Sequence, residues 1–475
     1  MPNSSDSLVF SETLPPPPAR LFLVGIGGIG MSGLAQFLLQ RGYAVGGSDR
    51  GLAEPARQEL FAKLKAQGIQ LFPQDGSGPR AFAPDAFIVS AAIEPGNLDL
   101  EALPDLPIIH RATALSQALA AMRCPLLTVA GSCGKTSVTG WLASALRALG
   151  HRVLMVNGGY CLDCETEMFP GNFFTDDNPV FLVAEVDESD KSIREFQPDY
   201  ALLLNVGHDH YDNAELQRVF AAYLGRARCA AVAPADLSSL LPTTVPTACF
   251  SQTEAPGSAY PTDYQARPSG ISFQVPGFGT VNCRQTGKHS AWNAVAILQL
   301  LRLVLPDVSG EALCQSLSYF DGIRQRFEVF PAQDGRYLVN DYAHNPEKIA
   351  AAISAARERF GSPLLLAFQP HGFRPFGFMR EELRAVLKDS LQPGDRFFLL
   401  PVFYAGGSAS FSPTSAEVAQ DFVASGLPVT AAERDDVAQA FQEASDCRCL
   451  LVMGARDASL RTFTAQLANS KGLLP

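Results

Sequence analysis

Residues 126–143 combine a short apolar run, a glycine turn and a lysine, in the order that a phosphate-binding loop requires. The apolar run 126–130 predicts a buried strand, and the apolar spacing after Lys135 predicts a helix. Between them lies Gly131-x-x-Gly134-Lys135-Thr136, which has two residues where the full Walker pattern has four. Backbone N–H groups of such a turn converge on an anion, the lysine reaches the outer phosphates and the hydroxyl can hold Mg²⁺. We therefore predict a nucleotide phosphate site, and the alternative is an ordinary strand–turn–helix connection with a surface lysine.

A second glycine turn lies near the N-terminus. Residues 25–33 read GIGGIGMSG, between a predicted strand over 20–24 and a predicted helix that runs to about residue 41. Asp49 ends the next predicted strand, nineteen positions beyond Gly30. Glycines, context and trailing carboxylate match the dinucleotide-binding fingerprint, which puts a diphosphate on the helix N-terminus and a ribose hydroxyl on the acid. This pattern does not distinguish NAD from another nucleotide diphosphate.

Carboxylates and imidazoles follow two further predicted strands. Glu185 ends the strand 180–185, and the strand 200–205 runs into a segment rich in histidine and aspartate. Ligands of open α/β sheets bind at the carboxyl ends of strands, so groups at neighbouring ends would lie together beside the phosphate loop. We interpret them as a Mg²⁺ and nucleotide site, although each segment alone could be a solvated polar loop. The remaining polar residues are Asp187, Glu188, Asp190, His208, Asp209, His210 and Asp212.

Composition limits the classes of function. A length of 475 residues predicts two to four domains, and 47% hydrophobic with 18% charged residues is typical of a globular protein. The formal net charge of −11 argues against nucleic acid or an anionic membrane as the main partner. No run of eighteen apolar residues occurs, so no membrane insertion is expected. Ten cysteines, mostly inside apolar runs, predict reduced thiols and a cytoplasmic location, and the pair Cys161/Cys164 lacks a second half that would indicate zinc.

The pattern of elements predicts an α/β fold of three domains: N-terminal Rossmann-like, central P-loop ATPase-like and C-terminal Rossmann-like. Residues 226–285 have β-type patterning, and a helix begins at residue 288, where His289 and Asn293 share a face and could reach a base or simply be solvated. Strands predicted from residues 336, 364, 396 and 449 alternate with helices. The expected organisation is a disordered leader over 1–19 and three domains over 20–123, 124–326 and 327–475, the second of which carries the phosphate loop.

These motifs together resemble the Mur ligase family, the ATP-dependent amino-acid ligases of peptidoglycan precursor synthesis. The chain looks most like the alanine-adding branch, because GIGGIGMSG with Gly47-Ser48-Asp49 is most specific to that branch and its murein-peptide-recycling relative. The other motifs, in chain order, are residues 109–112, Gly131-x-x-Gly-Lys-Thr136, residues 185–190, Asn205 with Asp209-His210, Asn293, Arg326, Asp341-Tyr-x-His344 and Phe368-Gln-Pro-His371.

The resemblance implies an activity, a set of site residues and a role for each domain: UDP-sugar binding over 20–123, ATP binding over 124–326 and amino-acid binding over 327–475. ATP and Mg²⁺ would drive amide formation between the carboxylate of UDP-N-acetylmuramic acid and L-alanine through an acyl phosphate, in a monomer or weak homodimer. The implied catalytic residues are Lys135, Glu185, His210 and Arg326, with Thr136, Glu185 and His210 at metal. The implied ATP-binding residues are Gly131, Ser132, Gly134, Lys135, Thr136, Ser137, Asn293, Arg326 and Asp341. The implied UDP-sugar residues are Gly25, Gly27, Gly28, Ile29, Gly30, Met31, Ser32, Asp49 and Arg111, and the implied amino-acid-binding residues are His344, His371 and Arg374.

The chain departs from the family pattern at several of these positions. Cys133 replaces an imidazole in the phosphate loop, Gln325 replaces one of two paired arginines, and Asn345 replaces a second histidine. In the loop that begins at Phe368, one arginine expected to bind the amino-acid carboxylate is lost, and the other is displaced by one position to Arg374. The identity of the amino acid therefore stays open.

Three alternatives accompany the main reading. A ligase of the same chemistry could add a different amino acid or a recycled murein peptide. A nicotinamide-dependent dehydrogenase would explain the first glycine turn but has no use for a second phosphate loop. A non-catalytic sugar-nucleotide sensor is disfavoured by the retention of Lys135, Glu185 and His210.

Overall fold

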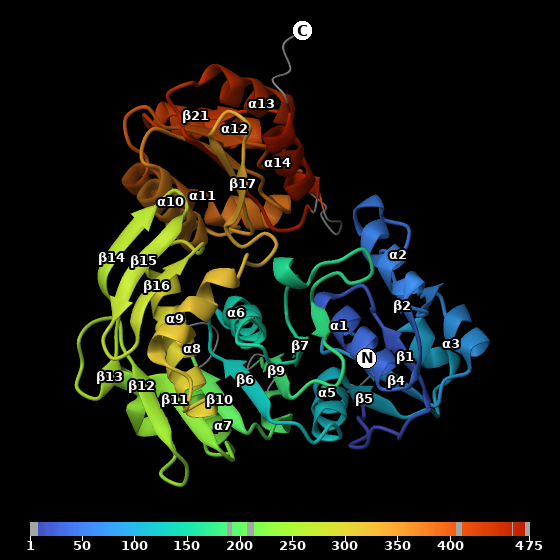
Figure 1. Ribbon diagram of the computed structural model, residues 1–475. Coiled ribbons are helices and arrows are strands. Elements are labelled where there is room, and N and C mark those ends of the chain that lie inside the picture. Colours follow the sequence, from blue (N-terminus) through green and yellow to red (C-terminus); the bar gives the residue numbers. More distant parts are fainter. Residues whose placement is uncertain (1–7, 188–191, 207–212, 405–410, 458, 471–475) are drawn as a thin grey trace. The chain divides into compact units, whose positions relative to one another are not determined.

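The computed structural model of the protein describes residues 8–187, 192–206, 213–404, 411–457 and 459–470. The chain divides into two compact units (Figure 1). Unit 1 comprises Met1–Tyr264, Ser272–Arg284 and Lys288–Ile323, and unit 2 comprises Gln265–Ile271, Gln285–Gly287 and Arg324–Pro475.

Unit 1 begins with a five-stranded parallel sheet of strand order β3-β2-β1-β4-β5. This order is that of a Rossmann-like sheet, as the first glycine turn predicts. The strands are β1 (Arg20–Val24), β2 (Ala44–Asp49), β3 (Gln70–Pro73), β4 (Ala86–Val89) and β5 (Ile108–His110). The helices are α1 (Ile29–Gln40), α2 (Gln58–Ala66), α3 (Ser77–Phe82), α4 (Leu98–Ala102) and α5 (Arg111–Ala120).

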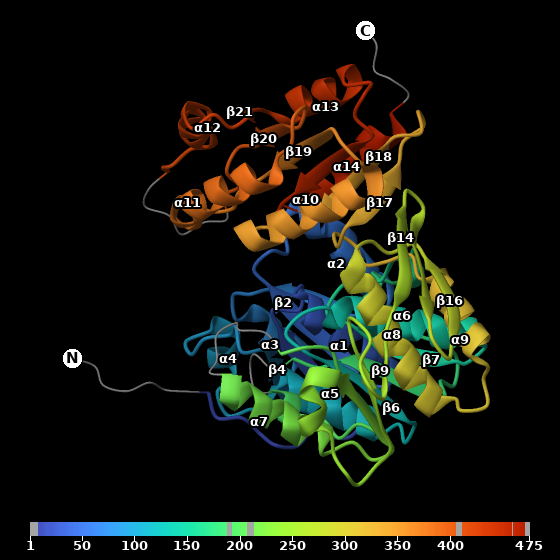
Figure 2. The same cartoon turned by 90° about the vertical axis from the view of Figure 1, so that its left-hand side faces the viewer.

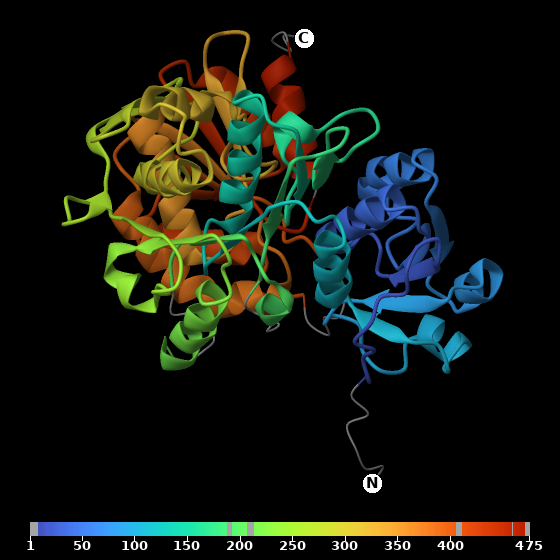
Figure 3. The ribbon, with the colours of Figure 1, turned by 60° about the horizontal axis from the view of Figure 1, so that its bottom comes forward.

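The expectation of a disordered leader over residues 1–19 is wrong for residues 8–19, which run beside β5 (Figure 3). The backbone N–H of Ser11 donates to Ile108 at 2.7 Å, and that of Leu14 donates to the Gln117 side chain at 2.8 Å. The Leu14 side chain is buried in the core, and the Tyr43 hydroxyl donates to the Pro15 carbonyl at 2.9 Å. The polar, proline-rich composition predicted disorder, but contacts with distant residues order this segment. Residues 1–7 lie outside the described part of the chain.

The second sheet of unit 1 has eight strands in the order β13-β12-β11-β10-β6-β9-β7-β8. All its pairings are parallel except that of β8 with β7. The strands are β6 (Leu126–Ala130), β7 (Val153–Val156), β8 (Phe173–Thr175), β9 (Phe181–Glu185), β10 (Tyr200–Leu203), β11 (Ala230–Pro234), β12 (Thr247–Phe250) and β13 (Ser258–Ala259). The helices are α6 (Lys135–Ala148), α7 (Asn213–Leu224), α8 (Lys288–Val304) and α9 (Gly310–Ser316).

The β-type patterning over 226–285 corresponds to β11, β12, β13 and a separate three-stranded sheet. That sheet has the order β14-β15-β16, formed by β14 (Thr262–Arg267), β15 (Gly270–Val275) and β16 (Gly279–Cys283).

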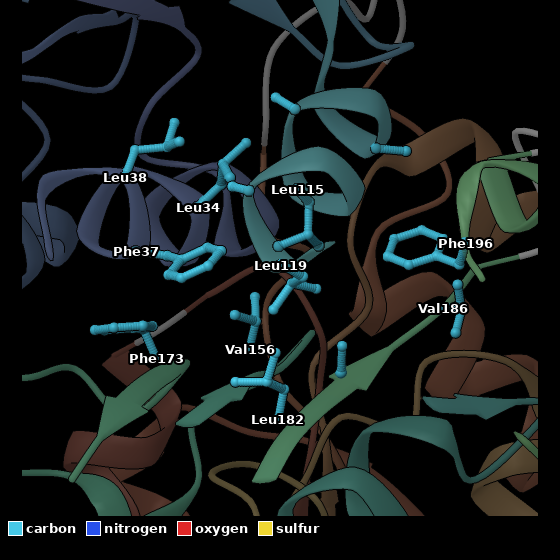
Figure 4. Close-up of a cluster of buried hydrophobic side chains, with 14 of the residues drawn as sticks. Leu34, Phe37, Leu38, Leu115, Leu119, Val156, Phe173, Leu182, Val186 and Phe196 are labelled. Carbon is cyan, nitrogen blue, oxygen red and sulfur yellow. The ribbon is translucent and has the colours of Figure 1, made fainter. Parts of the chain in front are cut away.

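One hydrophobic core runs through the Rossmann-like sheet and the eight-stranded sheet of unit 1. Leu34, Phe37 and Leu38 of α1 and Leu115 and Leu119 of α5 lie in the same cluster as side chains of β7, β8 and β9 (Figure 4). Because this apolar cluster excludes water, it fixes the start of α1 relative to the strands that follow the phosphate loop.

Unit 2 contains a six-stranded sheet of order β17-β18-β22-β19-β20-β21, parallel except for the edge strand β17. Alternate residues of β19 face opposite sides: Leu364 and Leu366 pack with α10, α11 and α12, whereas Leu365 packs with α13 and α14. Figure 2 shows α10 and α11 on one side of the sheet and α13 on the other. The strands are β17 (Glu328–Pro331), β18 (Tyr337–Asp341), β19 (Leu364–Phe368), β20 (Arg396–Leu399), β21 (Val429–Ala431) and β22 (Cys449–Met453). The helices are α10 (Pro346–Phe360), α11 (Phe373–Ser390), α12 (Ser415–Ala424), α13 (Arg434–Glu443) and α14 (Ser459–Asn469).

The predicted α/β class is confirmed by these parallel-rich sheets. The exact domain boundaries stay a prediction. Among the described residues, none of the helices is both long and apolar enough to span a bilayer.

Candidate active site

The phosphate loop joins β6 to α6 through two glycines with left-handed backbone. Gly131 has φ +138° and Gly134 has φ +87°, and a Cβ on Gly131 would lie 3.1 Å from the backbone nitrogen of Asn205. Asn205 follows β10, the neighbour of β6, and its side chain accepts from Cys133 N at 2.9 Å and donates to Cys133 O at 2.9 Å. This clamp positions the turn and leaves Cys133 and Gly134 exposed at the start of α6. The helix N-terminus and its backbone N–H groups are the anion-binding elements that the sequence predicts there.

Lys135, Thr136 and Glu185 meet at the carboxyl ends of β6 and β9. Strand register pairs Val129 with Glu185, so the glutamate lies beside the turn. The Thr136 hydroxyl donates to Glu185 Oε1 at 3.2 Å, and Gly158 N donates to Oε2 at 2.8 Å. Lys135 Nζ lies 3.7 Å from Asp187 Oδ1. Burial raises the pKa of Glu185, although the Gly158 hydrogen bond and the Lys135 charge oppose the rise.

The residues here fit a magnesium ion. Mg²⁺ in nucleotide sites takes one or two protein oxygens and keeps waters or substrate phosphates as its other ligands. The Thr136 hydroxyl and the buried Glu185 carboxylate supply two hard oxygens beside the phosphate loop. A cation would also offset the electrostatic cost of burying Glu185. His210, predicted as a further metal ligand, lies outside the described residues, as do Glu188, Asp190, His208, Asp209 and Asp212.

Asn293, in the first turns of α8, also lies beside the phosphate loop. A Cβ added to Gly134 would be 3.4 Å from Asn293 Nδ2. The amide is therefore close to the phosphate-binding turn, as expected for a residue of the ATP site.

Asp49 fastens the first glycine turn to β2. Its carboxylate accepts from Gly27 N at 2.8 Å, from Gly51 N at 2.7 Å and from the Arg57 guanidinium at 3.1 Å. A Cβ on Gly27 would lie 2.7 Å from Asp49 Oδ2, so only glycine permits this approach. Asp49 is thus a buried structural acceptor, and its predicted contact with a uridine stays a prediction.

Arg111 brings a positive charge to the first turn of α1. A Cβ on Gly30 would lie 2.9 Å from a terminal nitrogen of the Arg111 guanidinium. Arg111 is the first residue of α5, whose N-terminus is capped by the His110 ring accepting from Ala112 N at 3.3 Å. A guanidinium at a helix N-terminus suits a diphosphate. Ile29 is 41% exposed here, whereas Met31 and Ser32 are buried.

Two buried asparagines connect the two glycine turns. The Asn172 side chain donates to Ile29 O at 2.6 Å and to Ser32 Oγ at 2.9 Å. The backbone carbonyl of Asn172 accepts from Asn157 N at 2.9 Å, and the Asn157 side chain donates to Thr136 O at 3.1 Å. Both are at most 2% exposed. The starts of α1 and α6 are thereby joined through a short chain of hydrogen bonds. Sequence reasoning missed both residues because neither belongs to a recognisable motif.

In unit 2, Asp341 is the last residue of β18, and its carboxylate binds the backbone of the segment that leads into β17. Its carboxylate accepts from Phe327 N at 2.7 Å and from Ala343 N at 2.8 Å, and burial raises its pKa. The Arg326 guanidinium lies 5.2 Å from the centre of the Tyr342 ring. These contacts place Asp341 and Arg326 near each other, and their predicted roles toward ATP stay predictions.

His344 and His371 come together at the same sheet edge. Their ring centroids are 5.6 Å apart, and His344 Nδ1 is 3.0 Å from Tyr342 O. Burial lowers the pKa of both imidazoles, and nearby positive charges lower them further. Arg374 is exposed, with its guanidinium 5.4 Å from the centre of the Phe378 ring. The structure thus brings together the two predicted histidines.

Fold and site define an α/β protein with two glycine turns at helix N-termini, joined by hydrogen bonds. Family models match three stretches: Mur ligase family, catalytic domain, over residues 21–123; Mur ligase middle domain, over 129–225; and Mur ligase, glutamate ligase domain, over 325–456. A UDP-N-acetylmuramate–L-alanine ligase of Streptomyces griseus is 30% identical over 461 residues, which cover 92% of this chain and 94% of the relative. A protein of the same name from Acidithiobacillus ferrooxidans is 30% identical over 444 residues, covering 86% and 89%.

Solved structures share the fold. The UDP-N-acetylmuramate–alanine ligase of Thermotoga maritima matches with a TM-score of 0.75 at 24% identity, covering 94% of this chain and 99% of that one. A murein peptide ligase of Psychrobacter arcticus matches with a TM-score of 0.63 at 20% identity, covering 96% and 100%. The chain belongs to the Mur ligase family, and the predicted ligase class is confirmed.

Proposed function

We propose that the protein is an ATP-dependent ligase that joins L-alanine to the lactyl carboxylate of UDP-N-acetylmuramic acid. The observation that carries the proposal is the hydrogen-bonded link from Ile29 through Asn172 and Asn157 to Thr136. A sugar-nucleotide diphosphate on the first turn and a triphosphate on the second would then be held by one rigid unit. The relatives in Streptomyces griseus and Acidithiobacillus ferrooxidans, whose names state this reaction, support the same substrates.

The reaction proceeds in two displacements. A carboxylate oxygen of the sugar attacks the γ-phosphorus of ATP, the bond to the β,γ-bridging oxygen breaks, and ADP leaves. The amine of alanine then attacks the acyl carbon, phosphate departs with the C–O bond pair, and the nitrogen loses a proton. The products are the amide, ADP and inorganic phosphate. Both steps require positioning and charge neutralisation more than covalent help from the protein.

The residues divide this work by their positions. Lys135 and the backbone of Gly131, Ser132, Gly134, Thr136 and Ser137 hold the phosphates of ATP. Bound Mg²⁺, held by Thr136 and Glu185 with His210 as a further predicted ligand, would neutralise charge on the transferring phosphoryl group. Asn293, Arg326 and Asp341 complete the predicted ATP set. The first glycine turn with Ser32 and Arg111 binds the UDP-sugar.

The amino acid binds at the strand ends of unit 2. His344 and His371, whose pKa values are lowered by burial, are largely neutral at pH 7 to 8 and can accept a hydrogen bond from the amine. Arg374 is the further predicted contact in this set. We propose a cytoplasmic protein that is a monomer or weak homodimer and has no nucleic-acid partner.

The test is the mass of the product formed from ATP, Mg²⁺, UDP-N-acetylmuramic acid and an equimolar mixture of amino acids. The expected product is the alanine adduct, with one ADP released for each amide formed. A dominant product with another amino acid would favour the alternative of a ligase with the same chemistry but a different amino-acid substrate. An adduct formed only with a murein peptide would favour the recycling alternative. Absence of any ADP-coupled adduct would contradict the proposal.

A further inference from the structure

Three neighbouring strands of unit 2 end in register, and each carries a basic side chain at the same distance beyond its end. β22 lies between β18 and β19, and its Met453 pairs with Asp341 on one side and with Phe368 on the other. His344, Arg456 and His371 each stand three residues beyond this line. Because parallel strands in register end at one edge, Arg456 belongs to the loop between the two histidine loops.

Hydrogen bonds hold these loops together. Gly454 N donates to Asp341 O at 3.0 Å, and Gln369 N donates to Met453 O at 2.9 Å. The Arg456 charge also lowers the pKa of both imidazoles, by less than burial and by less than the Lys348 and Arg326 charges at His344 or the His344 charge at His371. A positive charge therefore lies near the two histidines at this edge of the sheet.

Arg456 is available for an anion. Asp457, the next residue, pairs with Arg434, and Asp341 is held by the backbone N–H groups of Phe327 and Ala343. Within the described residues, no carboxylate forms an ion pair with Arg456. A guanidinium that forms no ion pair with a described carboxylate, beside two imidazoles of lowered pKa, suits a small zwitterion better than a neutral ligand.

The loop after β19 is poorly arranged to supply that charge. Gly372 has φ +72°, and a Cβ there would lie 3.2 Å from Pro375 Cδ, so a side chain at this position would be strained. Arg374 lies instead over Phe378, whose side chain is 77% exposed. Arg456, just beyond the end of the neighbouring strand β22, could therefore supply the positive charge that this loop lacks.

We propose that Arg456 binds the α-carboxylate of the incoming amino acid and thereby selects free α-amino acids as acceptors. His344 and His371 follow the two strands that flank β22, where the α-amine of the same molecule can reach them. This inference rests on the proposed ligase function and adds a residue that determines the class of its amine substrate. A carboxylate and a guanidinium form two parallel hydrogen bonds, which fix orientation as well as affinity.

The test compares L-alanine with L-alaninamide, which keeps the amine and the methyl group but lacks the carboxylate charge. Steady-state kinetics of ADP release are measured at saturating ATP and UDP-N-acetylmuramic acid for the wild type, Arg456→Ala and Arg456→Lys. We expect Arg456→Ala to raise the KM for alanine by about 10- to 100-fold, the worth of a charged hydrogen bond. The preference for alanine over alaninamide should fall toward unity, and Arg456→Lys should restore part of it. The KM for ATP should change by less than about twofold.

A matched control is Arg448→Ala. Arg448 is exposed and precedes β22 at the opposite end of the same strand, so its loss should leave both substrates unaffected. If Arg456 has only a structural role, Arg456→Ala should raise the KM for alanine and the KM for alaninamide by the same factor. This result would overturn the proposal. Loss of the preference in Arg374→Ala but not in Arg456→Ala would overturn it as well. If the wild type forms no amide with any amine, the proposed function fails; if it ligates alanine but the variants keep the preference, only the present inference fails.

Discussion

At the scale of the residue, replacing Lys135 should impair the proposed ATP site and leave the proposed UDP-sugar site intact. Lys135 is the first residue of α6, directly after the phosphate loop, and its Nζ lies 3.7 Å from Asp187 Oδ1. We expect Lys135→Ala to reduce kcat by at least about 100-fold, because a charge that stabilises the transferring phosphoryl group is removed. Binding of UDP-N-acetylmuramic acid, measured by calorimetry, should remain within about threefold. Lys65→Ala, at an exposed lysine of α2, is the control, and unchanged turnover in Lys135→Ala would contradict the assignment.

We expect the Glu185 carboxylate to lower the stability of the ligand-free protein although catalysis requires it. Burial raises the pKa of its carboxyl group in the folded protein. A raised folded pKa means that the contribution to stability is fully present below the unfolded pKa and is lost as the pH rises through the folded pKa. Glu185→Gln should therefore unfold at a higher temperature than the wild type at pH 8 without ligands, and this advantage should shrink toward pH 5.

The same Glu185→Gln substitution should lower kcat by at least about 100-fold and weaken the dependence on Mg²⁺, because one ligand oxygen loses its charge. Thermal unfolding at the two pH values and an Mg²⁺ titration of ADP release measure both effects. Glu254→Gln, at an exposed carboxylate, controls for net charge. A lower thermal midpoint at pH 8 would show that Glu185 is stabilised in the ligand-free protein, contrary to this account.

At the scale of the element, the strand ends could be predicted from the sequence, but the links between them could not. Short apolar runs before glycine predicted β1 and β6 because a buried parallel strand leaves a local signature. Asn157 and Asn172 carry no such signature: their partners Thr136 and Ile29 lie 21 and 143 positions away. For the same reason, Arg456 was not predicted, since its position depends on β22 lying between β18 and β19.

The Asn172 link makes a prediction about α1. Replacing Asn172 with alanine leaves Ile29 O without this donor, so we expect a loss of about 1 to 3 kcal/mol in the free energy of unfolding. Because the first glycine turn leads into the start of α1, the KM for the UDP-sugar should also rise several-fold. Chemical denaturation and steady-state kinetics measure the two effects, with the exposed Asn282→Ala on β16 as control. If stability falls and the KM is unchanged, the link only supports packing and does not position the turn.

At the scale of the whole molecule, the chain does not divide at a single point. Segments 265–271 and 285–287 belong to unit 2 although their neighbours belong to unit 1. Within unit 2, the Arg359 side chain of α10 is 8% exposed and donates to Pro268 O at 3.0 Å and to the Thr286 hydroxyl. A sequence boundary near residue 326 could not include these segments, because only three-dimensional contacts, such as those of Arg359, assign them to unit 2.

The net charge of −11 repels both proposed nucleotides, which are polyanions, so only local groups can attract them. A ligand that binds the folded state alone stabilises it by about 2.7 kcal/mol at one hundred times its Kd. Mg²⁺–ATP and UDP-N-acetylmuramic acid should each raise the thermal midpoint of the wild type by a few degrees. Lys135→Ala should keep the shift with the UDP-sugar and lose most of the shift with Mg²⁺–ATP, because the first glycine turn does not depend on the lysine. Differential scanning fluorimetry with each ligand separately measures these shifts. Loss of both shifts in Lys135→Ala would mean that the two turns form a single nucleotide site, and the ligase proposal would then have one substrate too many.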